Sequence, residues 1–470
     1  MSVGADPGSF RDPSSRVFRD GARVVRVLDE QAAADFTALE GSKLFERATS
    51  DGRLVATRRL DAVPAELVDA DSSSSTWVAA LEHERVAIVS YPYEWTFAML
   101  QDAALLTLDL TLEALDEGLI TKDATPYNVQ FVGARPVFID IGSFERLTKG
   151  EPWFGYRQFC EMFLNPLLLT ARRGIAFQPL LRGSTRGVTP SQTAASLRLR
   201  DRARPAVFTH VSLHARLERR YADTERDVRG EVKRAGFGPA IIRAQLQKLR
   251  KLVARLDWKA SSSTWSEYSE RGHYGDDDLR AKTDLVRQVA AQRHRGLILD
   301  LGANDGFFSD AVVDHADTVV AVDSDALVVD RLYRRLRERG ERRILPLVID
   351  LADPPGGIGW RNRERAPFLA RVAPDLLLCL AVVHHLAITD TVPLEEIVAW
   401  LRDFDAEVVV ELPLRSDPMV QRLLRAKKDR TFERYDQSVF EAALERCFDT
   451  RAREVLPSGT RVLYHLAPRS

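Results

Sequence analysis

The C-terminal part of the sequence predicts an α/β fold, and an α+β domain with a helical connector is expected before it. From about residue 284, short apolar runs alternate with stretches of helical periodicity. The runs are continuous, as in strands that are buried on both faces of a parallel sheet. The last two candidate strands, 450–456 and 460–466, are separated only by Pro-Ser-Gly, and a turn that short joins antiparallel strands. We therefore expect a parallel sheet closed by an antiparallel hairpin.

The domain organisation follows from the length and from the change in pattern along the chain. A chain of 470 residues is too long for one ordinary hydrophobic core. We expect an N-terminal α+β domain over 1–200, a helical connector over 201–283 and the α/β domain over 284–470. Residues 1–22 have the composition of a loose tail.

The composition restricts the class of protein and its partners. Hydrophobic residues make up 45% of the chain and charged residues 29%, which is typical of a globular protein. The net charge is −1, from 67 basic and 68 acidic residues, so no global charge attracts nucleic acid or an acidic membrane. The arginine-rich run at 197–205 is interpreted as a solvated helix face.

Cysteine usage and the apolar runs indicate the compartment. The three cysteines are far apart and predict neither a disulfide framework nor a metal cluster. The N-terminus has no apolar segment typical of a signal peptide, and no run reaches the roughly 18 apolar residues of a membrane helix. We expect a cytoplasmic protein with no membrane partner, and the sequence leaves its oligomeric state open.

The N-terminal domain is expected to combine short strands with one long helix. Three short runs are strand candidates: 22–28, 52–60 and 85–91. Apolar residues at helical spacing predict a helix over 94–117. The segments 128–132 and 136–140 flank Gly-Ala-Arg and predict a β-hairpin. Residues 151–255 are expected to be mostly helical.

The C-terminal domain is expected to alternate strands and helices. Helices are predicted from residue 305 and over 325–340. The strand candidates before the closing hairpin are the apolar runs at 296–301, 318–323, 343–350, 374–383 and 406–413.

A glycine-rich turn, Asp-Leu-Gly-Ala-Asn-Asp-Gly at 300–306, follows the first of these strands. Ligands of open α/β sheets bind beyond the carboxyl ends of the strands, where this turn lies. Gly302 and Gly306 allow the backbone to approach a ligand closely, and Asn304 tolerates positive φ. A phosphate-binding loop would need Gly-Lys-Ser/Thr, and a dinucleotide loop would need a third glycine where Phe307 stands. S-adenosylmethionine, which has no pyrophosphate, fits the turn better.

Three acidic residues end three successive strands of the predicted sheet. Asp300 ends the first strand and can meet the amino-acid part of the cofactor. Asp323 ends the second, 323 − 302 = 21 residues after the first glycine, where a carboxylate can accept from both ribose hydroxyls. Asp350 ends the third and can accept from the adenine amino group. The alternative for each residue is a helix N-cap.

These motifs resemble those of the class I S-adenosylmethionine-dependent methyltransferases over about 284–470. The turn at 300–306 resembles their first motif, with Asn304 in place of the usual middle glycine. Ala-Val-Asp at 321–323, Val-Ile-Asp at 348–350 and the run 374–387 resemble the next three. The region from 265 to 444 is similar to a bacterial subgroup with nodulation-protein-like members. The resemblance implies a Rossmann-like methyltransferase sheet.

Methyl transfer is an in-line displacement, so the protein mainly positions the donor and the acceptor. His384 and His385 follow the fourth strand, and either could accept a proton from the methyl acceptor. Glu411, after the fifth strand, is the next candidate base. The alternatives are an ordered loop for the histidines and a buried helix cap for the glutamate. Tyr274 and Lys282 precede the domain and are candidates to close over the cofactor, with Lys282 at its carboxylate.

A second set of polar residues lies at 122–145. Asp123, Asn128 and Asp140 stand in the order Asp-x-x-x-x-Asn, two strands, Asp, which resembles the catalytic segment of kinase-like phosphotransferases. No glycine-rich phosphate loop is found, and Arg58 or Arg59 stands where a strand lysine is expected. The alternative is a loop whose polar residues satisfy local backbone.

The histidine pair His210 and His214 has the i, i+4 spacing of metal ligands on a helix. No glutamate stands between the two histidines in the HExxH manner, and no third ligand is evident. We therefore expect no metal site.

The sequence thus predicts an S-adenosylmethionine-dependent methyltransferase with a kinase-like or accessory N-terminal domain. A small molecule or a glycan is the expected acceptor. RNA ranks second, because the sequence lacks a basic platform interleaved with aromatic residues. The alternatives from other classes are a kinase-like phosphotransferase and a protein that binds the cofactor without catalysis.

Overall fold

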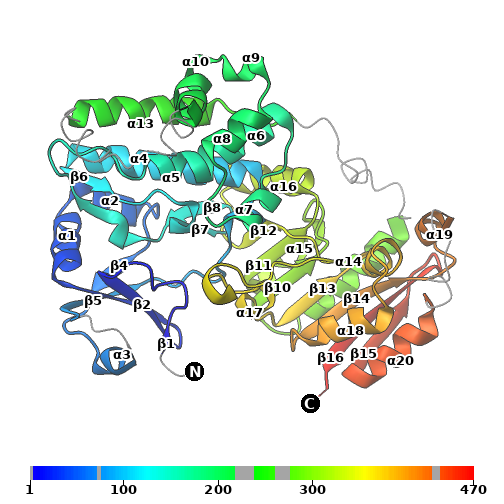
Figure 1. The fold of residues 1–470 in the computed structure, drawn as a ribbon. Helices are drawn as coiled ribbons and strands as arrows, with labels where there is room; N and C mark the ends of the chain where they lie inside the picture. Colours follow the sequence, from blue (N-terminus) through cyan, green and yellow to red (C-terminus); the bar gives the residue numbers. More distant parts are fainter. Residues whose placement is uncertain (1–3, 71–75, 217–237, 260–275, 426–434, 470) are drawn as a thin grey trace. The chain divides into compact units, whose positions relative to one another are not determined.

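The computed structural model describes residues 4–70, 76–216, 238–259, 276–425 and 435–469, with the side chains of 68–70 left aside (Figure 1). The chain forms two compact units. Unit 1 comprises Met1–Phe131, Pro136–Ala260 and Ile358–Arg365, and unit 2 comprises Val132–Arg135, Ser261–Gly357 and Ala366–Ser470. The boundaries expected at residues 200 and 283 stay a prediction. No described helix is both long and apolar enough to cross a bilayer.

Unit 1 begins with a five-stranded antiparallel sheet in the order β1-β2-β3-β5-β4. Its strands are β1 Gly4–Ala5, β2 Ser15–Asp20, β3 Arg23–Leu28, β4 Thr57–Arg59 and β5 Ala79–His83. The expectation of a loose tail over 1–22 is wrong for the described part, because β2 pairs with β3 along its whole length. Phe18 of β2 is fully buried against Val25, Val27, Leu67 and Ala80.

The run 85–91 is not a strand, contrary to the prediction. The strand next to it in sequence, β5, ends at His83. The backbone of Ser90 pairs with a side chain instead of with a strand. The amide oxygen of Gln130 accepts from the Ser90 N–H at 2.8 Å, and its amide nitrogen donates to the Ser90 carbonyl at 2.9 Å. The buried backbone of Ser90 is therefore satisfied without a sheet.

The predicted long helix and hairpin are confirmed. Helix α4 spans Phe97–Asp116, and Thr96 caps it by accepting from the N–H of Met99 at 3.2 Å. Strands β7 Val129–Val132 and β8 Arg135–Phe138 form a two-stranded sheet. A second small sheet pairs β6 Leu119–Thr121 with β9 Phe144–Arg146.

The rest of unit 1 is mainly helical, as predicted for 151–255. Helix α13 packs along α4, and the amide nitrogen of Gln101 donates to the carbonyls of Val253 and Leu256, both at 2.8 Å. The α-helices of unit 1 besides α4 are α1 Glu30–Glu40, α2 Lys43–Ser50, α3 Ala65–Ala70, α5 Tyr156–Phe159, α6 Asn165–Arg173, α7 Gln178–Gly183, α8 Pro190–Ser196, α9 Leu199–Arg202, α10 Pro205–Val207 and α13 Pro239–Ala254. The π-helical turns η4 Cys160–Leu164 and η5 Phe208–Ser212 extend α5 and α10.

Unit 2 is built on a seven-stranded sheet in the order β12-β11-β10-β13-β14-β16-β15. The strands are β10 Arg295–Leu301, β11 Ala316–Asp323, β12 Ile344–Val348, β13 Leu376–Cys379, β14 Glu407–Pro413, β15 Phe448–Val455 and β16 Arg461–Pro468. The first five pair in parallel, and β16 pairs antiparallel with both β14 and β15. The predicted fold class, including the antiparallel closing hairpin, is confirmed.

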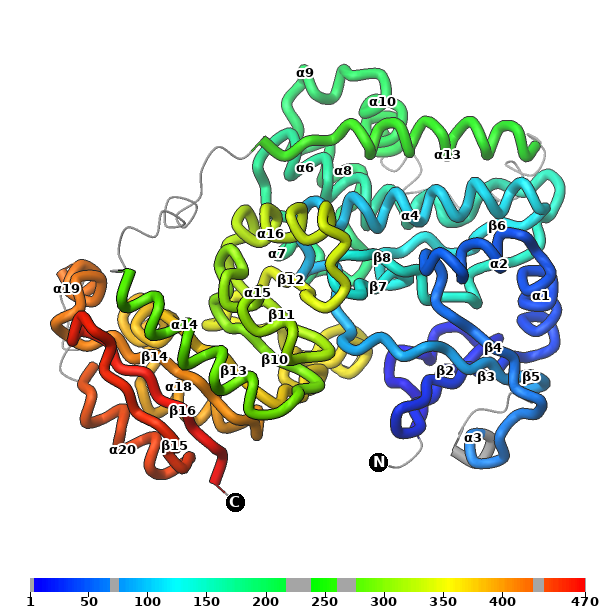
Figure 2. Tube along the Cα trace, turned by 180° about the vertical axis from the view of Figure 1, so that it is seen from behind, coloured from blue at the N-terminus to red at the C-terminus, as the bar shows by residue number. Residues whose placement is uncertain are grey.

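Helices cover both faces of this sheet. Helices α14 Asp276–Ala290, α15 Phe307–Val312 and α16 Ala326–Glu338 lie on one face, and α18 Leu394–Arg402 and α20 Gln437–Cys447 lie on the other (Figures 1 and 2). The other described α-helices of unit 2 are α17 Phe368–Arg371 and α19 Pro418–Arg425. This coverage explains why the central parts of the parallel strands are continuous apolar runs, since they are buried on both faces of the sheet.

Candidate active site

The glycine-rich turn lies at the carboxyl end of β10 and has the backbone geometry that the sequence predicts. Gly302 has φ of +76°, and a Cβ atom there would lie 2.3 Å from Cγ2 of Val382. Gly306 has φ of +78° and Asn304 has φ of +48°. A side chain at 302 would therefore meet both backbone strain and a steric clash, so the position requires glycine.

Asp323 ties the end of β11 to this turn. One carboxylate oxygen accepts from the Asn304 N–H at 3.0 Å, and the other accepts from the Asp325 N–H at 2.9 Å. Burial raises the pKa of Asp323, and these backbone donors oppose the shift. The acid and the turn are thus adjacent at the carboxyl edge of the sheet, and each oxygen retains a lone pair for a further donor.

Asp300 is buried beneath the turn. Its carboxylate accepts from the hydroxyl of Ser309, on α15, at 2.7 Å. Burial raises the pKa of Asp300 to about 7, and the nearby charge of Asp323 also raises it. The two acids therefore interact electrostatically. The sequence did not single out Ser309, which follows the turn as an ordinary helical residue.

Asp350, two residues beyond β12, is exposed, and its carboxylate accepts from the Ala352 N–H at 2.9 Å. This bond closes a local turn, whereas the alternative considered for this acid was a helix N-cap. Tyr274, the other predicted cofactor contact, lies outside the described residues.

A buried network of charges joins α14, β14 and β16. The ammonium of Lys282 lies 2.6 Å from one oxygen of Glu411, and the guanidinium of Arg461 lies 2.9 Å from the other. Arg461 also binds Asp417 at 2.7 Å. Lys282, predicted to meet the cofactor carboxylate, binds Glu411 here. Arg461 and Asp417 were not predicted as site residues, because charged residues near strand ends are usually solvated.

The network defines the ionisation of Glu411. Burial alone would raise its pKa, but Lys282 and Arg461 together lower it below the ordinary value. Both carboxylate oxygens are occupied by these two cations. Glu411 is therefore ionised, and its geometry suits a role in holding Lys282 and Arg461 better than proton transfer.

His384 and His385 follow β13 at a bend where Ala381 has φ of +57°. Their ring centroids are 4.1 Å apart, and His384 is buried. Burial lowers the pKa of both histidines, that of His385 to about 4, and the charge of Arg461 lowers both further. Both rings are therefore neutral near pH 7. Within the described part of the chain, Nδ1 of His384 has no hydrogen-bond partner.

In unit 1 the structure brings Asp123, Asn128 and Asp140 into one neighbourhood. The Asn128 amide donates to the Ser143 hydroxyl at 2.9 Å, and this hydroxyl donates to Asp140 at 2.7 Å. Burial raises the pKa of Asp123, and the charge of Asp140 adds to the shift. The guanidinium of Arg26, on β3, lies 2.7 Å from the other oxygen of Asp140.

The sequence did not predict that Arg26 would be the cation paired with Asp140. Arg58 and Arg59, the predicted candidates, form ion pairs with Glu82 and Glu40. Arg26 belongs to a strand that was predicted. Its ion-pair partner Asp140 is 140 − 26 = 114 residues away in the chain, and the local sequence around Arg26 does not indicate this contact.

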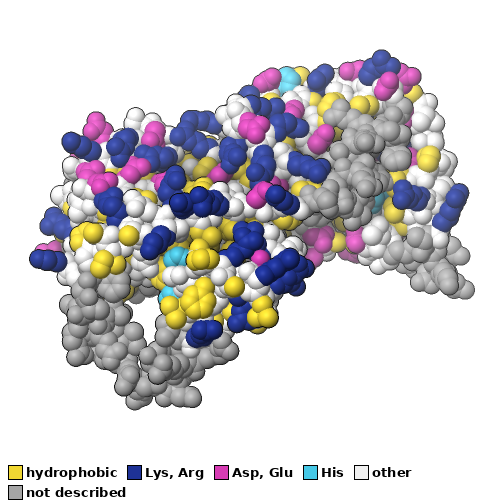
Figure 3. Space-filling model, turned by 90° about the horizontal axis from the view of Figure 1, so that it is seen from above, with side chains coloured by type: hydrophobic (Ala, Val, Ile, Leu, Met, Phe, Trp, Pro, Cys, Tyr) yellow, Lys and Arg dark blue, Asp and Glu magenta, His cyan; other side chains and the backbone are white. Residues whose placement is uncertain are grey.

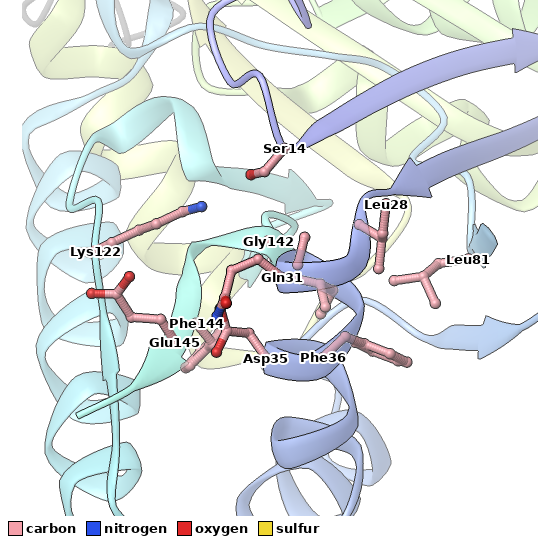
Figure 4. Close-up of a pocket in the computed structure, with 12 residues that line it drawn as sticks. Ser14, Leu28, Gln31, Asp35, Phe36, Leu81, Lys122, Gly142, Phe144 and Glu145 are labelled. Atoms are coloured by element: carbon pink, nitrogen blue, oxygen red, sulfur yellow. The ribbon is translucent and has the colours of Figure 1, made fainter. Parts of the chain in front are cut away.

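A cavity of about 140 Å³ lies in unit 1 beside this neighbourhood (Figure 4). Its polar side chains are that of Ser14, those of Gln31 and Asp35 on α1, and those of Lys122 and Glu145 in the 122–145 segment. Burial raises the pKa of Glu145, and Lys122 partly offsets the shift.

The histidine pair of unit 1 has a structural explanation. The hydroxyl of Tyr156 lies 2.8 Å from Nδ1 of His210 and 3.0 Å from Nε2 of His214. Burial lowers the pKa of His210 to about 4. In the ranges that the structure describes, no group of three His, Cys, Asp or Glu side chains is arranged to hold a metal ion.

The strand order of unit 2, the antiparallel strand β16 between β14 and β15, and the glycine turn beside Asp323 define the fold of the class I S-adenosylmethionine-dependent methyltransferases. No protein-family model matches the chain. Nodulation protein NoeA of Rhizobium meliloti (strain 1021) is 34% identical over 465 residues, which cover 97% of this chain and 94% of that protein. The chain belongs to the NoeA family of nodulation proteins.

Solved structures are similar to parts of the chain at low identity. The N-methyltransferase NodS from Bradyrhizobium japonicum WM9 is 11% identical, with a TM-score of 0.31, over 41% of this chain and 98% of that one. Its complex with S-adenosyl-L-homocysteine has a TM-score of 0.32 at 11% identity, over 44% and 100%. The bifunctional kinase-methyltransferase WbdD is 18% identical, with a TM-score of 0.30, over 41% and 40%.

Proposed function

We propose that the chain transfers a methyl group from S-adenosylmethionine to a small-molecule or glycan acceptor. The observation that carries the proposal is the hydrogen bond between the Asp323 carboxylate and the backbone of Asn304, since it joins an acid to a glycine-rich turn at the carboxyl ends of neighbouring parallel strands. The residues assigned to the cofactor are Asp300, Gly302, Asn304, Gly306, Asp323, Asp350, Tyr274 and Lys282.

The residues present fit this cofactor. Gly302 has φ of +76°, which a residue with a side chain rarely adopts, and it keeps the turn beside Asp323 at the carboxyl end of β10. Asp323 is anchored by two backbone N–H groups and retains acceptor capacity for the ribose hydroxyls. When bound, S-adenosylmethionine supplies an electrophilic methyl group. The chain itself binds and orients both reactants and excludes water from them.

We assign His384 as the residue that accepts the proton of the methyl acceptor. Its ring is neutral and buried, and its Nδ1 atom, without a partner among the described residues, suits an acceptor of an O–H or N–H hydrogen bond. The ring of His385 lies beside it, with the centroids 4.1 Å apart and the ring planes at 43°. Glu411 is assigned to positioning, because it holds Lys282 and Arg461.

Cofactor binding is tested by calorimetry with S-adenosylmethionine on the full chain. Asp323→Ala removes a charge-assisted acceptor and is expected to weaken binding by roughly tenfold to a hundredfold. Asp314→Ala is the matched control, because Asp314 is highly exposed and pairs with Arg343 on the surface. Equal affinity of wild-type protein and Asp323→Ala would remove the basis of the proposal.

The acceptor is identified by a labelled-methyl transfer assay on cell extract, followed by mass analysis of the labelled product. The family name adds a role in nodulation to the proposal. Binding of the cofactor without any labelled product would favour the non-catalytic alternative, and a labelled RNA would favour the acceptor that ranks second.

A second candidate function rests on the gathering of Asp123, Asn128 and Asp140 in unit 1. A phosphotransferase centred there predicts magnesium-dependent ATP turnover that disappears in Asp140→Ala. The ion pair between Arg26 and Asp140 weighs against it, because the guanidinium occupies an oxygen that a metal ion would need. Turnover that persists in Asp140→Ala would exclude this assignment.

A further inference from the structure

A surface of unit 1 combines exposed arginines with exposed apolar side chains. It is formed by α9, α10 and η5, where α9 and α10 both contact η5. Figure 3 looks down on this face, and hydrophobic side chains gather there with Lys and Arg side chains around them. We call it the arginine–leucine patch, and its members are Arg198, Leu199, Arg200, Arg204, Phe208 and Arg216.

The apolar members stand out from the surface. Leu199 is 79% exposed, and Phe208 is also exposed. The guanidinium of Arg216 lies over the ring of Phe208, with Cζ 5.4 Å from the ring centroid. A single exposed apolar side chain such as Leu199 is common on protein surfaces. When it lies next to other exposed apolar side chains, the group indicates a contact surface.

The charge of the patch is of one sign. The segment 197–216 contains five arginines and one acidic residue, Asp201. Asp201 is buried and lies 3.7 Å from Arg204, so it offers little negative charge to the surface. Among the described residues, Arg198 and Arg200 form no ion pair.

The neighbouring helix α13 is a contrast within the same unit. Arg243 and Arg250 of α13 are paired with Asp116 and Asp109 of α4. Charges there are used to hold two helices together. Arg198 and Arg200 of the patch have no such ion pair among the described residues, so their charge is available to an external partner.

We propose that the arginine–leucine patch binds the surface of an anionic lipid bilayer. Arginines can meet lipid phosphates while Leu199 and Phe208 enter the boundary between headgroups and acyl chains. Single-stranded nucleic acid is a poorer match, because it needs several aromatic faces for stacking and the patch as defined has one, that of Phe208. The proposal departs from the expectation that the chain has no membrane partner, and such a contact needs no spanning helix.

The proposal is independent of the methyltransferase assignment, since the patch contains none of the residues assigned to the cofactor or the acceptor. It is tested by co-sedimentation of the full chain with vesicles. Vesicles of equal parts phosphatidylcholine and phosphatidylserine are expected to retain the protein at low salt, and vesicles of phosphatidylcholine alone are not. Rising salt is expected to release it.

Substitutions separate the two contributions. Arg198→Gln and Arg200→Gln are each expected to weaken the partition coefficient by roughly 5-fold, and Leu199→Ser by about tenfold. Arg243→Gln on α13 is the control and is expected to leave retention unchanged. Circular dichroism of each variant verifies that it is folded.

Three results would overturn the proposal. The first is no retention of wild-type protein on the anionic vesicles. The second is retention that survives in the triple variant of Arg198, Arg200 and Leu199. The third is binding to heparin that needs the arginines but not Leu199, without retention on vesicles, which would assign the patch to a soluble polyanion.

Discussion

The ammonium of Lys282 lies 2.6 Å from a carboxylate oxygen of Glu411, with the two side chains 1% and 0% exposed. An ion pair removed from water to this degree gains little net stability, because desolvation of both groups opposes their attraction. Here Arg461 and Asp417 extend the pair, so that two positive and two negative charges compensate one another. The network therefore constrains where α14, β14 and β16 lie more than it stabilises the fold.

Removal of the central carboxylate is predicted to be strongly destabilising. Glu411→Gln keeps the shape of the side chain but leaves the charges of Lys282 and Arg461 without this partner, which costs about 3–5 kcal/mol of unfolding free energy. Lys282→Met is expected to cost less, because Glu411 keeps Arg461. Urea unfolding measures each value.

Asp277→Asn, on helix α14 with Lys282, is the control for this prediction. Asp277 pairs with Arg280, and the two side chains are 75% and 72% exposed. Such a pair contributes little, so the variant is expected to stay within about 0.5 kcal/mol of wild type. Similar losses in Glu411→Gln and Asp277→Asn would contradict the description of the network as buried and interdependent.

The requirement for glycine at position 302 gives a second prediction. Gly302→Ala is expected to destabilise unit 2 through two effects, a positive φ that costs an alanine about 1–2 kcal/mol and a clash with Val382. Gly340→Ala isolates the first effect, because Gly340 has φ of +68° and no atom within 4 Å of an added Cβ. Denaturant unfolding should rank Gly302→Ala as the larger loss.

A second substitution tests the origin of that difference. Val382→Ala removes the methyl group nearest to the added Cβ and should recover part of the stability of Gly302→Ala. Equal losses in Gly302→Ala and Gly340→Ala would mean that the turn relaxes away from Val382 and that the position does not need glycine on steric grounds.

The fold of unit 2 could be predicted because its signals are local. Each parallel strand is a continuous apolar run, and the Pro-Ser-Gly turn allows only one pairing of β15 with β16. The glycine turn and Asp323 could also be placed, because both follow strands whose ends meet at one edge of a parallel sheet. The roles of Lys282 and Glu411 could not, because their partner Arg461 is distant in sequence.

Unit 1 was harder to predict because its elements depend on contacts between distant residues. The short strand β2 appears as a tail until its pairing with β3 and the burial of Phe18 are known. The run 85–91 has the composition of a strand, yet the buried N–H and carbonyl of Ser90 pair with one side chain, that of Gln130. A local pattern carries no information about either partner.

This use of Gln130 leads to a third prediction. Gln130→Leu fills a similar volume but leaves the buried N–H and carbonyl of Ser90 without their partner. The expected loss is about 1–3 kcal/mol for each unpaired group. Gln31→Leu is the control, since the Gln31 amide donates to Asp35 at an exposed site. A loss in Gln130→Leu as small as that of the control would show that water replaces the amide.

The fourth prediction concerns the pH dependence of stability. Burial raises the pKa of Asp300 to about 7, whereas an unfolded chain has an ordinary aspartate near 3.8. Between these values the folded chain retains a proton that the unfolded chain has lost, so the unfolding free energy falls as pH rises from about 4 to about 7. A single proton contributes at most about 1.4 kcal/mol per pH unit.

Asp300→Asn is expected to remove this part of the pH dependence, because an amide does not ionise and its carbonyl can still accept from the Ser309 hydroxyl. The stability of the variant relative to wild type should therefore increase with pH over the same window and level off above it. Urea unfolding of the cofactor-free chain at a series of pH values measures the difference. Asp314→Asn, at an exposed carboxylate, should run parallel to wild type, and a parallel course for Asp300→Asn as well would mean that the carboxyl of Asp300 ionises normally in the folded chain.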